Sequence, residues 1–108
     1  MNRTLAWGLC WSFFAALPCS AADIGPEHAS KLVRLVRQDC GSCHGLQLTG
    51  GLGPALLPST LADKPATSLV ATILGGRKGT AMPPWRGMLT EQEAKWIVER
   101  LQTEFPKE

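Results

Sequence analysis

The sequence is poor in the residues that most catalytic and structural sites need. Its 108 residues include four cysteines and two histidines, and eleven basic side chains face nine acidic ones, for a net charge of +2. A charge so close to neutral gives no support for nucleic-acid binding. The sequence has no strand pattern, no repeat, no low-complexity segment and no constellation of acid, base and nucleophile. We therefore expect a small all-α domain that is not an enzyme.

The first 22 residues are expected to be a cleaved signal peptide. A basic start at Met1–Arg3 precedes an almost wholly apolar run from Thr4 to Leu17, and Ser20-Ala21-Ala22 supplies the small residues of a cleavage site. We place cleavage after Ala22, which leaves a single domain of residues 23–108. A retained membrane anchor is the alternative, but the run is shorter than the roughly 18–20 apolar residues that a spanning helix needs. We expect a periplasmic protein without stable membrane insertion.

Removal of this segment takes Cys10 and Cys19 away and leaves Cys40 and Cys43. Two thiols this close do not form a disulfide framework, and without a second Cys/His pair they cannot form a structural zinc site. Both lie in the run Cys40-Gly41-Ser42-Cys43-His44, the Cys-x-x-Cys-His pattern of haem c attachment. Thiols one helical turn apart can each add to one vinyl group of a haem, and the next residue then lies under the iron as its proximal ligand.

A thioredoxin-like redox pair is the alternative interpretation of Cys-x-x-Cys. It needs a strand before the motif, whereas the preceding residues indicate a helix. Gly25-Pro26-Glu27 is typical of a helix start, with proline at the first position, and apolar residues then recur on one face up to Cys40. We therefore expect one covalent haem c. We expect His28, in the first turn of this helix, to be solvated.

Two further helices are predicted. One begins at Asp63-Lys64-Pro65 and ends at Gly75-Gly76; the other begins at Thr90, where Glu93 completes a capping box, and ends before Pro106. Irregular stretches rich in glycine and proline cover residues 45–59 and 77–87, and a single turn is expected at 60–62. The first stretch carries leucines that can wrap a porphyrin or cover the helix ends: Leu46, Leu48, Leu52, Leu56 and Leu57. Each of the three predicted helices has one apolar face. In chain order these faces are Leu32, Val33, Leu35 and Val36; Leu69, Val70, Ile73 and Leu74; and Ala94, Ile97, Val98 and Leu101.

This order of helices, Cys-x-x-Cys-His motif, Gly/Pro loop and Met-Pro loop resembles the class I cytochromes c. The resemblance implies an all-α fold in which the N- and C-terminal helices cross over a covalently bound haem. It also implies that a carbonyl of Gly53-Pro54 accepts a hydrogen bond from His44, which would orient the ring. We expect Trp85 to cover a haem edge and Trp96 to pack at the helix crossing.

Met82 is the expected sixth ligand of the iron. A thioether binds Fe(II) well and raises the reduction potential, and Pro83 and Pro84 stiffen the segment that presents the sulfur. Met88 is the competitor, but it has no prolines after it and is expected to lie in the core. The three basic residues around Met82 form either a positive rim at the exposed haem edge or an ordinary solvated loop: Arg77, Lys78 and Arg86.

A narrower resemblance lies in three segments: residues 40–45, 49–56 and 79–85. They are similar to the NirC-type cytochromes c, small periplasmic proteins encoded with cytochrome cd nitrite reductase in denitrifying bacteria. This resemblance implies electron donation to that nitrite reductase, or a redox role in the maturation of haem d. A haem-based ligand-binding protein is a further alternative, which would need an open sixth position. We expect a monomer that meets its redox partners briefly.

Overall fold

The computed structural model describes residues 23–108, so the expected signal peptide lies outside the described residues. Within this range every regular element is helical and no strand occurs. The elements are α1 (Pro26–Leu35), the π-helical segment η1 (Val36–Cys40), α2 (Gly41–His44), α3 (Pro58–Leu61), α4 (Ala66–Gly75) and α5 (Glu91–Thr103). The expected all-α class is confirmed. The expected single turn at 60–62 is found slightly earlier, as α3, because Pro58 begins it.

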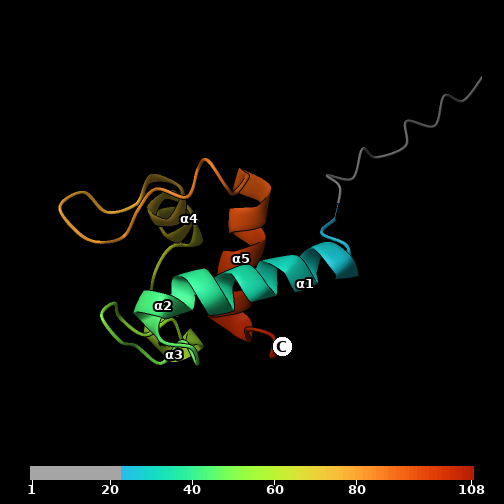
Figure 1. Cartoon of the computed structure of the whole chain (residues 1–108), viewed down its shortest axis with the longest axis horizontal. Helices are drawn as coiled ribbons and strands as arrows, with labels where there is room; N and C mark the ends of the chain where they lie inside the picture. The colour runs from blue at the N-terminus through green and yellow to red at the C-terminus, as the bar shows by residue number, and fades with distance from the viewer. Residues whose placement is uncertain (1–22) are drawn as a thin grey trace, which may run out of the picture.

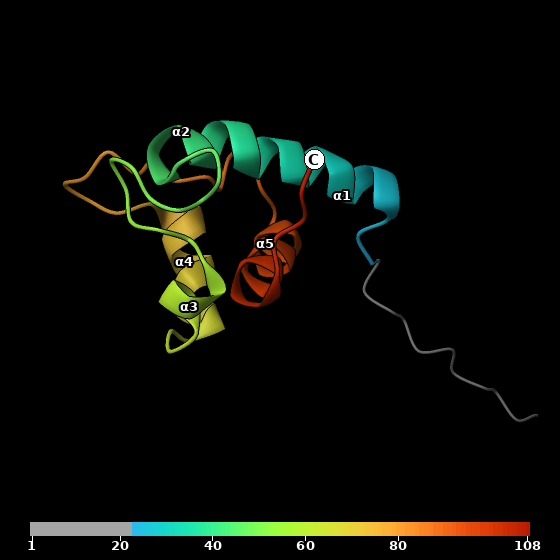
Figure 2. The same ribbon diagram turned by 90° about the horizontal axis from the view of Figure 1, so that it is seen from below.

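The three N-terminal elements form one continuous rod, which we call the N-terminal rod (residues 26–44). It lies across α3, α4 and α5 as a separate layer, and α1 crosses α5 (Figures 1 and 2). Pro26 begins the rod and Glu27 sits in its first turn, as expected. The widening of the helix at η1, just before the Cys-x-x-Cys-His motif, was not predicted. Such π-helical turns occur frequently at functional sites.

Both layers contribute to one hydrophobic core. Val36 of the rod and Ala94 of α5 are fully buried, and Ile97 and Val98 are almost so. Trp85 and Trp96 are partly buried and pack against the same cluster. The cluster consists of Leu32, Val36, Leu48, Leu61, Val70, Leu74, Leu89, Ala94, Ile97, Val98 and Leu101. Most residues of the three predicted apolar faces therefore lie in this core or pack against it, although Val33 is buried outside the cluster. Leu48, Leu61 and Leu89 join the core from outside those faces.

Two side chains were expected in other surroundings. Met88 was predicted to lie in the core but is 66% exposed, whereas Leu89 is 4% exposed. The N–H groups of both residues donate to the carbonyl of Trp85 at 2.8 Å, and this turn directs Leu89 inward and Met88 outward. His28 is exposed, but Nε2 lies 2.7 Å from Oε1 of Glu93, so it is not simply solvated.

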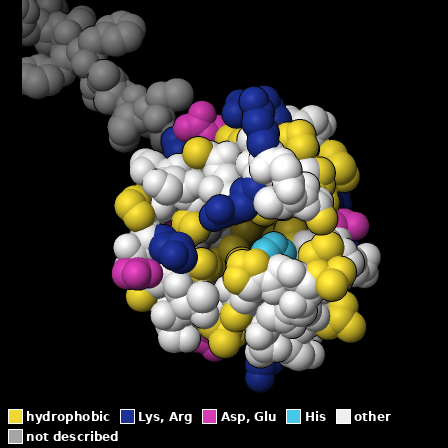
Figure 3. All heavy atoms as spheres, turned by 90° about the vertical axis from the view of Figure 1, so that its left-hand side faces the viewer, with side chains coloured by type: hydrophobic (Ala, Val, Ile, Leu, Met, Phe, Trp, Pro, Cys, Tyr) yellow, Lys and Arg dark blue, Asp and Glu magenta, His cyan; other side chains and the backbone are white. Residues whose placement is uncertain are grey.

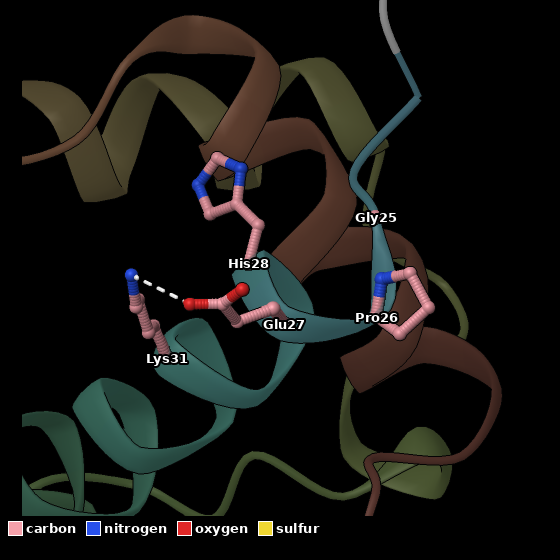
Figure 4. A pocket seen from close by; sticks show the side chains of 5 residues that line it. All are labelled: Gly25, Pro26, Glu27, His28 and Lys31. Carbon is pink, nitrogen blue, oxygen red and sulfur yellow. Dashed lines mark ion pairs between the residues drawn. The ribbon is translucent and has the colours of Figure 1, made fainter.

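The start of α1 shows how this contact arises. In Figure 4, Glu27 points towards Lys31, with which it forms an ion pair of 3.4 Å, while His28 extends away towards α5. Glu93 bonds to α1 through His28 and also to the start of α5, because its other carboxylate oxygen accepts the N–H of Thr90 at 2.7 Å. The hydrogen bonds from Thr90 and then from His28 hold the pKa of Glu93 below its ordinary value.

The C-terminal residues contact both layers of the fold. Nε2 of Gln102 donates to the carbonyls of Leu61 and Lys64 at 3.1 and 2.9 Å, which ties the end of α5 to α3. The Arg37 guanidinium donates to the carbonyl of Pro106 at 2.8 Å and lies 5.3 Å from the centre of the Phe105 ring. Among the described residues, no helix is both long and apolar enough to cross a membrane.

The capping box of α5 is present as predicted, with the Thr90 hydroxyl accepting the N–H of Glu93 at 3.2 Å. We predict that Thr90→Ala lowers the free energy of unfolding by about 1 kcal/mol, because one N–H at the helix start loses its acceptor. Thr103→Ala, at the exposed C-terminal end of the same helix, is the control and should cost less than about 0.5 kcal/mol. Equal losses in urea unfolding would contradict a role for the cap.

Candidate functional site

The two thiols lie at the C-terminal end of the N-terminal rod. Cys40 ends η1, is partly buried and packs against the core, while Cys43 is partly buried in α2. Burial, and to a lesser extent the Asp39 carboxylate, raises the pKa of the Cys40 thiol to about 11. Reactive cysteines of redox Cys-x-x-Cys pairs have pKa values below the usual value of about 8.5. Cys40 therefore does not fit the thioredoxin-like alternative.

His44 is held in one orientation by the loop that follows it. Its Nδ1 lies 2.7 Å from the carbonyl oxygen of Pro54, so Nδ1–H donates and Nε2 is left as the ring nitrogen that can bind a metal. Gly53 lies directly against the ring, since a Cβ at this position would be 2.8 Å from Cε1. Only glycine allows the chain to pass this close. The contact that the resemblance implied for His44 is therefore present.

Main-chain hydrogen bonds fold this loop back onto α2. The N–H of Gly50 donates to the carbonyl of His44 and the N–H of Gly53 to that of Cys43, both at 2.8 Å. Gly45 has φ 90°, and a Cβ there would lie 2.6 Å from the oxygen of Gly50, so the tight return requires glycine. The carbonyl of Pro54 is thus placed by the backbone rather than by side-chain packing.

The leucines of the loop differ widely in burial. Leu48 is 2% exposed and belongs to the core, and Leu56 packs against it. Leu46 and Leu52 are 68% and 94% exposed. Leu52 directly precedes the glycine that touches the His44 ring, so this exposed apolar side chain lies beside the candidate site.

Met82 lies on a separate loop, residues 77–87, held by the end of α4. It is partly buried, and its carbonyl accepts the N–H of Arg77 at 3.2 Å. Figures 1 and 2 both show this loop extending on the same side of the molecule as α2 and the loop after it. Arg77, Lys78 and Arg86 are all exposed on it.

That side of the molecule has a hollow. Figure 3 shows hydrophobic side chains inside it, a histidine at its edge, Lys and Arg side chains on one flank and hydrophobic side chains on the other, with acidic groups only at the periphery. This apolar recess lies on the same side of the molecule as the end of the rod, which carries two thiols one turn apart and an oriented imidazole. The combination fits a covalently attached porphyrin. The pocket lined by Gly25, Pro26, Glu27, His28 and Lys31 lies at the opposite end of the rod and is unrelated to these residues.

Comparison with known proteins gives consistent matches. Residues 27–99 match the family described as cytochrome c oxidase, cbb3-type, subunit III. Cytochrome c55X of Pseudomonas aeruginosa is 55% identical over 102 residues, which cover 93% of this chain and 85% of that protein. A solved c-type cytochrome NirC is 56% identical, with a TM-score of 0.71 over 72% of this chain and 92% of that one. A solved dihydro-heme d1 dehydrogenase NirN, in complex with DHE, is 37% identical with a TM-score of 0.61, over 69% of this chain and 16% of that one.

The contact between Gly53 and His44 can be tested in the haem-loaded protein. We predict that Gly53→Ala pushes the ring away from the Pro54 carbonyl and weakens the expected bond between His44 and the iron by about tenfold. Acid should then displace the histidine at a pH roughly one unit higher than in wild type, because a weaker bond loses to protonation sooner. The loss of the low-spin visible spectrum on acid titration measures this.

Gly87→Ala is the matched control, because a Cβ at that position meets no atom within 4 Å. Its titration should follow that of wild type. If Gly53→Ala also titrates like wild type, the glycine contact does not hold the ring.

Proposed function

The chain belongs to the c-type cytochromes, in the family of cbb3-type cytochrome c oxidase subunit III, and we propose which of its residues bind the haem and which proteins exchange electrons with it. Like its relatives it is an electron-transfer cytochrome with covalently bound haem c. We assign Cys40 and Cys43 to the two thioether bonds, Nε2 of His44 to the proximal position and the sulfur of Met82 to the sixth position. The single observation in the structure that carries this proposal is the 2.7 Å contact between Nδ1 of His44 and Pro54, which orients the proximal ligand.

The bound haem supplies reversible one-electron exchange between Fe(III) and Fe(II). The chain's own residues have to hold two axial donors in fixed positions, so that little rearrangement accompanies each electron. Pro54 orients one donor, and the main-chain contacts of residues 77–87 hold the other. Two firmly held donors favour an electron carrier over a haem-based ligand binder, which needs an exchangeable position. The absence of a catalytic constellation in the sequence agrees with a carrier.

The proposed partner is cytochrome cd nitrite reductase, to which the protein would donate electrons in denitrification. The resemblance of its loops to NirC-type cytochromes supports this, together with 56% identity to the solved NirC. The face in Figure 3 has the character of a docking surface for an acidic protein, since Lys and Arg side chains flank the hollow. Positive charge on this face would speed encounter, and salt would weaken the attraction. The exposed Leu52 adds an apolar contact beside His44.

A second candidate is acceptance of electrons during the maturation of haem d. The chain is similar to about a sixth of the protein named dihydro-heme d1 dehydrogenase NirN, which favours this role. Dehydrogenation of a dihydro-porphyrin releases two electrons and two protons. A carrier with one haem takes up one electron per encounter, so two oxidised molecules would be reduced for each product. Both candidates use the same site and differ in the direction of electron flow.

We further propose that residues 1–22 are a cleaved signal peptide and that the mature domain works in the periplasm. Attachment of haem to Cys-x-x-Cys-His takes place in exported proteins, and the apolar run with its Ala22 cleavage site fits export. A monomer with a small, transient interface suits a carrier that must release each partner quickly.

Axial ligation by Met82 can be tested by substitution. We predict that Met82→Ala abolishes the methionine–iron charge-transfer band of the oxidised protein and lowers the reduction potential on the order of 0.1 V, within the span of about 0.8 V that axial ligands control. Met88→Ala is the matched control and should change neither, because Met88 is 66% exposed. The assignment is wrong if Met88→Ala is the variant that removes the band.

The partner can be tested with stopped-flow mixing. We predict that reduced protein is reoxidised by purified cytochrome cd nitrite reductase and nitrite on the timescale of turnover. Replacement of Arg77, Lys78 and Arg86 by glutamine should slow the second-order rate by about tenfold at low salt, and this difference should vanish at high salt.

The control replaces Lys31, Lys64 and Lys95 by glutamine, which removes the same charge from other elements and should have a much smaller effect. Absence of reoxidation by nitrite reductase, with reduction of the oxidised protein by dihydro-haem d1 dehydrogenase and its substrate, would instead establish the maturation role.

A further inference from the structure

The end of α4 and the Met82 loop complete each other's hydrogen bonding. The last carbonyls of a helix lack partners within it. Those of Ile73 and Leu74 accept the N–H groups of Trp85 and Arg86, at 3.0 and 3.2 Å. Pro83 and Pro84 have no N–H, so the first donors available after Met82 are the two that α4 uses. The segment that carries Met82 is therefore fixed to the helix end just beyond the sulfur-bearing residue.

Gly76 makes this close approach possible. It follows α4 with φ 66° and ψ −170°, a combination that is essentially confined to glycine. A Cβ at this position would lie 2.7 Å from the carbonyl carbon of Pro83, 2.7 Å from the nitrogen of Pro84 and 2.8 Å from the oxygen of Met82. All three are backbone atoms, which cannot rotate away as the tip of a side chain can. Any larger residue at position 76 must displace the Met82 segment.

The residues between Gly76 and Met82 form a closed turn. The N–H of Arg77 donates to the carbonyl of Met82 at 3.2 Å, and the N–H of Thr80 donates to the carbonyl of Arg77 at the same distance. The Thr80 hydroxyl donates to that carbonyl at 2.8 Å and accepts the N–H of Met82 at 3.3 Å. Both main-chain groups of Met82 are thus engaged, and its side chain leaves a backbone of fixed direction.

We propose that Gly76 is the positioning residue for the sixth ligand. Its contact with Pro83 and Pro84 determines the position of the Met82 sulfur, and the hydrogen bonds of Thr80 hold the same segment. This inference rests on the proposed ligation by Met82. It assigns a function to a glycine that lies outside the haem motif and outside residues 77–87.

The test compares alanine at three glycines in the haem-loaded protein. Gly76→Ala introduces both the unfavourable φ and the backbone contact. Gly79→Ala introduces a positive φ of 76° with no atom within 4 Å, and Gly75→Ala introduces neither. We expect Gly76→Ala to weaken or abolish the methionine–iron band, to lower the reduction potential and to raise the affinity of the oxidised protein for imidazole by at least about tenfold.

Gly75→Ala and Gly79→Ala should keep the band and bind imidazole within about threefold of wild type. The inference is overturned if Gly76→Ala behaves as they do. It is also overturned if Gly79→Ala shows the same loss as Gly76→Ala, because strain in the loop would then suffice without contact with the prolines.

Thr80→Val provides a second measurement that does not introduce a clash. It keeps the shape of the exposed side chain and removes the hydrogen bonds to Arg77 and Met82. We expect an increase of about threefold in imidazole affinity with the thermal midpoint little changed. If Gly76→Ala does not yield folded protein, this variant decides, and wild-type affinity would count against the inference.

Failure of the inference differs from failure of the ligation. Met82→Ala run alongside must itself lose the band; if it does and Gly76→Ala does not, Met82 is the ligand but Gly76 does not position it. If Met82→Ala retains the band, the ligand assignment is wrong, and the inference falls with it.

Discussion

The site depends on one hydrogen bond, from Nδ1 of His44 to the carbonyl oxygen of Pro54. It selects the tautomer that leaves Nε2 free for a metal, and it fixes the plane of the ring. That carbonyl stays in place because the N–H of Gly53 donates to the carbonyl of Cys43 and the N–H of Gly50 to that of His44, so the loop is tied to the helix that carries His44. The motif and its orienting group therefore move as one body, although ten residues separate donor from acceptor.

The rest of the chain joins the N-terminal rod to the other helices. The core joins the N-terminal rod to α5, with Val36 and Ala94 fully buried. At the edge, Glu93 caps α5 and contacts His28 of α1, so one carboxylate joins the start of the last helix to the start of the first. Arg37 joins the rod to the C-terminal residues through Pro106. A domain of this size has little apolar surface to bury, and such ties between its layers supplement the core.

The sequence predicted the features that local chemistry determines. Pro26, Thr90 with Glu93, and the Gly75-Gly76 pair place helix ends within a residue or two, and the Cys-x-x-Cys-His run with Gly53-Pro54 indicated the orienting contact. What was missed depends on long-range geometry. The π-helical turn of η1 leaves no mark in apolar periodicity, the partner of His28 lies 65 residues away, and the outward turn of Met88 follows from hydrogen bonds to Trp85. The close contact of Gly76 with Pro83 and Pro84 depends on how the loop folds back onto the end of α4, which the sequence does not show.

The main-chain closure of residues 77–82 has a consequence for how such proteins can diversify. Backbone groups and one threonine hydroxyl make the hydrogen bonds that hold this loop. Its conformation therefore does not depend on the side chains of Arg77 and Lys78. Their identity can drift without altering the surroundings of the iron. A lineage could therefore exchange one redox partner for another by changing the charges on this surface, while the backbone that presents Met82 is inherited unchanged.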